Sequence, residues 1–139
     1  MKFLILFCAL VLFLISFIHI YWAIGGRWGS RAAIPTTDTG ERPAFTPKIW
    51  ETLTVAALVF IIACTLLIQA GTVSFIHPNF YSKWMCLIAG IIFLLRAIGD
   101  FNYMGFFKKI KGSTFAKNDT FLYNPLCVLL GIVYLMISL

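Results

Sequence analysis

The chain has 139 residues, of which 61% are hydrophobic and 12% are charged, and its formal net charge is +6. A soluble globular domain carries about 25% charged residues, so this composition excludes an ordinary water-soluble protein. The positive charge does not indicate nucleic acid, because the basic residues gather in two segments beside apolar runs, as in membrane proteins that face anionic headgroups. The four cysteines lie singly in apolar runs without a C-x-x-C pair, so we expect no metal site and no cofactor.

The chain contains four stretches that are long and apolar enough to cross a membrane. The first runs from residue 3 to about residue 24, and a helix of that length rises about 33 Å, more than the ~30 Å hydrocarbon core. A signal peptide is the competing interpretation, but the stretch is longer than a typical h-region and no A-x-A site follows it. The other helices are expected at about 48–72, at about 83–107 and from about 120 to 139.

Glycine and proline delimit the expected loops at 25–47, 73–82 and 108–119. The sequence offers two candidate starting points for the last helix. Thr120 caps a helix that begins at Phe121, or Asn124 caps one in which Pro125 takes the first position, where its missing N–H costs nothing. The second starting point leaves a helix of about 22 Å, which is short for a span, so we favour the longer helix that contains the proline.

Small or polar residues recur every seven positions on each of the four stretches. Lipid tails provide no hydrophobic drive between helices, so membrane interfaces favour small residues and hydrogen-bonding side chains. We therefore predict a single all-α domain over residues 1–139, a polytopic four-transmembrane-helix bundle with these stripes facing inward. The stripes are Ala9, Ser16 and Ala23; Glu51, Leu58, Thr65 and Thr72; Ala89, Arg96 and Tyr103; and Asn124, Gly131 and Ser138.

The basic residues predict an orientation in the membrane. Cytoplasmic loops of membrane proteins carry an excess of Lys and Arg. Eight of the eleven lie in or beside the first and third expected loops, and two, Lys2 and Lys83, belong to the opposite side. We therefore expect a multi-pass protein of the cytoplasmic membrane, with the first and third loops in the cytoplasm and both termini outside.

The third stretch carries charges of both signs within an apolar run. A charge at bilayer depth costs about 2.5–3.5 kcal/mol on insertion scales. Arg96 and Asp100 are four residues apart, so on a continuous helix they are neighbours on one face. Two interpretations stay open: an ion pair that locks helices together, or part of a ligand or proton site.

Several polar and aromatic residues are expected at similar depth in the cytoplasmic half of the bundle. We predict that they form one polar site, and no catalytic residue is assigned. His19 has a structural alternative as an interfacial histidine that hydrogen-bonds to a neighbouring helix, and Glu51 has one as a favourable anion at a helix N-terminus. The candidate ligand-binding residues are His19, Trp22, Glu51, Arg96, Asp100, Tyr103 and Asn124.

Three segments also carry a family resemblance. They read HIYWAIGGRWG from His19, FLLRAIGDFNYMGFFK from Phe93, and FAKNDTFLYNPLC from Phe115. With them, nearly the whole chain resembles a bacterial family of small integral membrane proteins known as domain of unknown function 3995. The resemblance implies four membrane spans and an uncharacterised bacterial protein, and it implies no activity.

Three classes of function fit these observations. The first is a pocket that binds or acts on a lipid-like small molecule, where ionisable groups among aromatic residues suit acid–base chemistry. The second is a small proton-coupled transporter, and the third is a structural or accessory membrane protein whose polar centre serves packing. We favour the first and leave open whether the protein is an enzyme. The expected partners are membrane lipids and a lipid-like small molecule, with a homo-oligomer as a further option and no nucleic acid.

Overall fold

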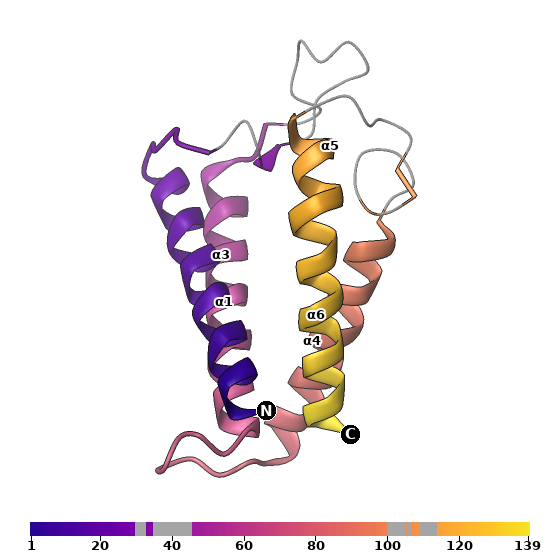
Figure 1. The fold of residues 1–139 in the computed structure, drawn as a ribbon. Coiled ribbons are helices and arrows are strands. Elements are labelled where there is room, and N and C mark those ends of the chain that lie inside the picture. The colour runs from indigo at the N-terminus through magenta and orange to yellow at the C-terminus, as the bar shows by residue number, and fades with distance from the viewer. Residues whose placement is uncertain (30–32, 35–45, 100–104, 106, 109–113) are drawn as a thin grey trace.

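The computed structural model describes residues 1–29, 33–34, 46–99, 105, 107–108 and 114–139, and within these ranges it contains helices and no strand. Four long helical segments stand side by side as a bundle (Figure 1). They are α1 (Lys2–Ala23), α3 (Ile49–Gln69), α4 (Phe80–Ile98), and a composite of α5 (Thr114–Asn118), the π-helical turn η1 (Asp119–Tyr123) and α6 (Asn124–Ser138). All four are long and apolar enough to cross a membrane, which confirms the prediction of an all-α, polytopic four-helix bundle.

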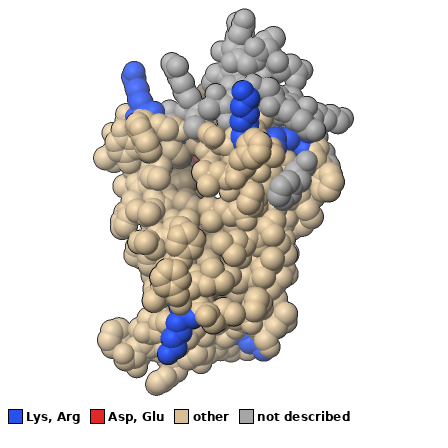
Figure 2. Space-filling model, in the orientation of Figure 1, with Lys and Arg blue, Asp and Glu red and all other residues tan. Residues whose placement is uncertain are grey.

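The bundle consists of two closely packed helix pairs. α1 packs most extensively against α3, and α4 against α6, while α3 joins the pairs through contacts with α4 and α6. Both termini lie at one end of the bundle (Figure 1). We call the opposite end, where α1 and α4 finish and α3 and α5 begin, the loop end. In the view of Figure 2, Lys and Arg atoms lie at the two ends and other residues cover the band between them, as expected for a membrane-spanning protein.

α4 begins at Phe80, earlier than the expected start near Lys83, because Asn79 caps it. The Asn79 side chain accepts a hydrogen bond from the Ser82 N–H at 3.0 Å, and the Ser82 hydroxyl accepts one from the Asn79 N–H at 3.0 Å. This reciprocal capping satisfies two backbone donors that a helix N-terminus leaves unpaired.

α4 ends at Ile98, so the expectation of a helix continuing to Phe107 is wrong. Gly99 follows with a φ of +80°, a conformation that glycine adopts without steric cost. Arg96 therefore lies in the last turn of α4, at the loop end. Asp100 and Tyr103 lie outside the described residues, so the predicted Arg96–Asp100 ion pair is not tested.

The last span begins earlier than either expected start. It covers Phe115–Ser138, so the favoured long helix containing Pro125 exists, but its expected boundary at Phe121 is wrong. Proline removes one hydrogen bond from a helix and crowds the preceding turn. Here that turn is π-helical, and the Asn124 N–H donates to the carbonyl of Asp119, five residues back. A wider turn thus lets the span pass through the proline.

The predicted inward stripes hold on α1 and on the last span, and they fail on α3. The buried members are Ala9, Ser16 and Ala23 on α1, and Asn124, Gly131 and Ser138 on the last span. On α4, Ala89 is buried and Arg96 is half-buried. On α3, Thr65 is buried, but Glu51 and Leu58 are exposed, and the inward face carries Ala56, Ala63 and Leu66. Thr72, which is also exposed, lies beyond the end of α3 at Gln69. Small alanines, rather than the polar residues, therefore set the α3 interface.

Polar side chains from all three neighbouring spans donate to backbone carbonyls of α3. The Ser16 hydroxyl donates to the Ala56 carbonyl at 2.7 Å, and the Tyr134 hydroxyl donates to the Ile62 carbonyl at 2.6 Å. The Cys86 thiol donates to another α3 carbonyl at 3.6 Å. Such bonds help to hold membrane helices together, because hydrocarbon offers these groups no other partner.

Gly131→Leu is expected to destabilise the bundle by about 1–3 kcal/mol, because α4 and α6 leave no room for a side chain there. A Cβ atom on Gly131 would lie 2.7 Å from Leu94 Cγ and 3.2 Å from the backbone oxygen of Gly90. Thermal unfolding in detergent micelles measures the effect. Ile132→Leu, at a neighbouring position that is 47% exposed, is the control. Equal melting temperatures for the two variants would contradict this close packing.

Candidate functional site

Asp119, the first residue of η1, is fully buried, accepts three hydrogen bonds and forms an ion pair with Lys108. Its Oδ1 accepts from Arg96 Nη2 at 2.7 Å. Its Oδ2 accepts from the Gly105 N–H at 2.8 Å and from Asn124 Nδ2 at 3.2 Å, and it lies 3.2 Å from Lys108 Nζ. An ionised carboxylate offers about four lone-pair sites, so the Asp119 carboxylate is saturated. We call Arg96, Gly105, Lys108, Asp119 and Asn124 the Asp119 cluster.

The π-helical turn places Asp119 and Asn124 where one guanidinium can reach both. Arg96 Nη2 donates to Asp119, and Arg96 Nη1 donates to Asn124 Oδ1 at 3.2 Å. In a regular α-helix, residues three and four apart are neighbours, and residues five apart diverge. The i to i+5 hydrogen bond of η1 brings positions 119 and 124 over one another instead. π-helical turns often occur at functional sites. This one connects the last span to α4, because Asp119 and Asn124 both bind Arg96.

Lys108 is buried at 3% exposure and its ammonium group is saturated. Nζ forms an ion pair with Asp119 Oδ2 and donates to the Gly105 carbonyl at 3.1 Å and to the Thr120 hydroxyl. An ammonium group has three N–H donors, and here each has an acceptor. Lys108 therefore anchors the segment between α4 and α5 onto η1, which is a structural role.

Arg96 differs from the other charged members of the cluster. Its side chain is 27% exposed, whereas that of Asp119 is 0% exposed. Its two hydrogen bonds to described residues use two of the five N–H donors of a guanidinium. Within the described part of the chain, the cluster contains two cations and one carboxylate, so its net charge is positive. Arg96 is thus the member that can receive a further anionic group.

The residues of the Asp119 cluster lie in the part of the chain that a protein-family model matches. The chain belongs to the family described as "Protein of unknown function (DUF3995)". The family model matches residues 12–134, which contain the whole Asp119 cluster, so the predicted resemblance is confirmed. No curated protein and no solved structure matches the chain. Family membership therefore assigns no activity, and any function must be argued from the site.

In this DUF3995 protein, the structure brings two of the seven predicted site residues together, Arg96 and Asn124. His19 and Trp22 form a separate group at the loop end of α1, with their rings 5.2 Å apart in an edge arrangement. His19 Nδ1 donates to the carbonyl of Ile15 in its own helix at 2.7 Å, and Trp22 Nε1 donates to the Trp28 carbonyl at 2.7 Å. Ligand binding by these residues stays a prediction.

Glu51 caps α3, which is the structural alternative considered for it. It is exposed, and its Oε2 accepts a hydrogen bond from the backbone N–H of Lys48 at 3.0 Å. A carboxylate at this position also interacts favourably with the helix dipole. Asp100 and Tyr103, the remaining predicted site residues, lie outside the described residues.

Sequence reasoning missed the centre of the cluster. Asp119 is the last residue of the basic loop expected at 108–119. Lys108 was interpreted as one of several lysines that fix topology. The available signal was the family motif itself, in which Asp119 and Asn124 stand five residues apart beside Pro125.

Proposed function

We propose that this membrane protein binds an anionic lipid-like molecule at its loop end and that Arg96 contacts the anionic head group. The observation that supports this is that the charged residues of the Asp119 cluster differ in how many of their hydrogen-bonding groups are paired. Asp119 and Lys108 are buried among partners within the protein, whereas the Arg96 side chain is 27% exposed and its hydrogen bonds to the described residues use two of its five N–H donors. A guanidinium is well suited to this role, because its planar fork matches carboxylate and phosphate oxygens.

The position of Arg96 supports a lipid rather than a ligand deep in the bilayer. Arg96 lies in the last turn of α4, where the apolar span ends and lipid head groups begin. Exposed Lys48 and Lys117 lie at the same end of the bundle. Basic pockets between helices on the cytoplasmic side of a membrane are typical binding sites for anionic head groups.

The proposal is tested by measuring which lipids stay bound to the protein. The protein is reconstituted in nanodiscs that contain equal amounts of phosphatidylcholine and phosphatidylglycerol, released, and analysed by native mass spectrometry. We expect phosphatidylglycerol to be retained preferentially, and to dissociate as the salt concentration rises before release, because an exposed charge pair is screened. Equal retention of the two lipids would contradict the proposal. Displacement of the lipid by inorganic phosphate, at an ionic strength at which chloride leaves the lipid bound, would identify a free anion as the ligand.

We also propose that the loop end faces the cytoplasm and that both termini face outside, from the distribution of Lys and Arg. The four native cysteines, which all lie in the spanning helices, are first replaced so that only the introduced cysteine can react. In intact cells, an impermeant maleimide should label Leu139→Cys and spare Lys117→Cys until the membrane is opened. The reverse pattern would place the Asp119 cluster at the outer face of the membrane.

A further inference from the structure

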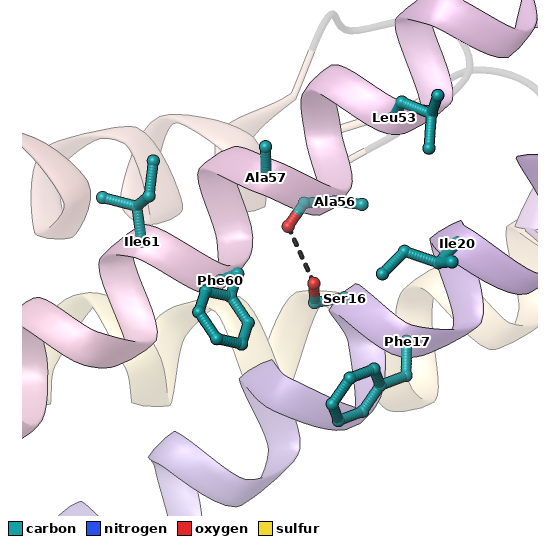
Figure 3. Close-up of a pocket in the computed structure, with 8 residues that line it drawn as sticks. All are labelled: Ser16, Phe17, Ile20, Leu53, Ala56, Ala57, Phe60 and Ile61. Atoms are coloured by element: carbon teal, nitrogen blue, oxygen red, sulfur yellow. Dashed lines mark hydrogen bonds between the residues drawn. The ribbon is translucent and has the colours of Figure 1, made fainter.

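A second region outside the Asp119 cluster has the form of a binding site. An apolar groove of about 400 Å³ lies between α1 and α3 (Figure 3). Its walls carry exposed Phe17 and Ile20 from α1 and exposed Phe60 and Ile61 from α3. We call it the α1–α3 groove. It lies on the helix pair that does not contribute to the Asp119 cluster.

The floor of the groove is closed and has no polar group in need of a partner. Ser16 and Ala56 are both buried there, and the Ser16 hydroxyl donates to the Ala56 carbonyl at 2.7 Å (Figure 3). Ala57, the next residue along α3, also lines the groove and has a short side chain. An occupant therefore gains apolar contact and finds no free hydrogen-bonding group, which excludes a polar ligand.

The dimensions and surroundings of the groove fit one occupant. Along α3 the lining extends from Leu53 to Ile61, a rise of about 12 Å, which approaches the ~15 Å depth of one hydrocarbon leaflet. Both helices span the membrane, so hydrocarbon chains surround the groove. Leu53 lies toward the loop end, where exposed Lys48 sits at the start of α3, so a chain in the groove places its head group beside a cation.

We infer that the α1–α3 groove is a binding site for one acyl chain of a phospholipid. The groove and the Arg96 site lie on different helix pairs, so this inference does not depend on the proposed function. Shape and apolar contact select the chain, while Lys48 favours an anionic head group.

The test uses the full-length protein in dodecylmaltoside with a trace of phosphatidylglycerol that carries a diazirine on its acyl chain. After irradiation, the crosslinked residues are mapped by mass spectrometry. We expect several-fold more labelling at the groove residues than on the exposed α4 face around Ile88 and Ile92, and we expect excess unlabelled lipid to compete.

Two matched variants decide the outcome. Ala57→Phe fills the groove and should reduce its labelling to the level of the α4 face. Leu58→Phe, at the next residue, which does not line the groove and is 57% exposed, should leave the labelling unchanged. Ala57→Leu is a smaller filling residue in case the phenylalanine variant does not fold. Equal labelling of groove and α4 face, or labelling that survives a folded groove-filling variant, would overturn the inference. A protein dimer seen by mass spectrometry of the intact protein that dissociates in Ala57→Phe would also overturn it, because a second chain would then be the occupant.

Discussion

Asp119→Ala is expected to lower the free energy of unfolding by about 3–5 kcal/mol, the largest loss of stability among the single substitutions considered. The change removes the carboxylate that pairs with Arg96 and Lys108 and leaves the buried Lys108 ammonium without a counter-charge. It also removes the acceptor of the Gly105 N–H, so a backbone donor is left unpaired in a buried position. Unfolding of the purified protein in detergent, followed by circular dichroism, measures the loss.

Glu51→Ala is the matched control for this experiment. Glu51 is also an acid at the loop end, but it is exposed and serves as a helix cap, so its loss should cost about 0.5–2 kcal/mol. If both substitutions cost the same small amount, the Asp119 carboxylate cannot be the junction between α4, η1 and the segment that contains Lys108.

Arg96→Met is expected to weaken phosphatidylglycerol binding at the Arg96 site at least tenfold, since charge-assisted hydrogen bonds contribute about 1.5–3 kcal/mol and each tenfold step corresponds to about 1.4 kcal/mol. The fold should survive, because Asp119 keeps its bonds to Lys108, Gly105 and Asn124. Native mass spectrometry of the lipid-bound fraction measures the binding, and circular dichroism verifies the helical content.

Two further variants separate specific binding from general attraction. Lys83→Met removes an exposed cation at the end of the bundle where both chain termini lie, and it should leave the bound lipid unchanged. Arg96→Lys keeps the charge but cannot reach Asp119 and Asn124 together as the guanidinium fork does, so we expect intermediate binding. If Arg96→Met and Lys83→Met lower the bound lipid equally and Arg96→Lys leaves it unchanged, net charge alone attracts the lipid.

The architecture was predictable because a membrane imposes strong constraints on sequence. A span needs about 20 apolar residues, and four such stretches were visible from their length alone. The inward faces of α1 and the last span followed from small residues at seven-residue spacing, such as Ser16 and Gly131. α3 was predicted less well, because Glu51 and Thr72 lie near the helix ends, where polar residues face head groups and water rather than the bundle interior.

The site was only partly predictable, because it depends on where helices stop. Arg96 was expected to have a polar partner, and the partner that was predicted, Asp100, lies outside the described residues. α4 ends at Gly99, which has a positive φ, and Gly105 lies against the end of that helix. The partner Asp119 is 23 residues away and becomes inward-facing through a π-helical turn, for which the sequence offers no periodic signal.

The central claim is that the Arg96 guanidinium, held by Asp119 and Asn124, contacts the head group of a bound lipid. Solid-state NMR dephasing between ¹³Cζ-labelled arginine and lipid ³¹P measures this contact directly in phosphatidylglycerol-containing vesicles. We predict a dephased arginine signal that disappears in Arg96→Lys, because a guanidinium-to-phosphate hydrogen bond brings nitrogen and oxygen within about 2.7–2.9 Å. Dephasing that is identical in the wild type and in Arg96→Lys would contradict the account, because the phosphate contact would then belong to other arginines.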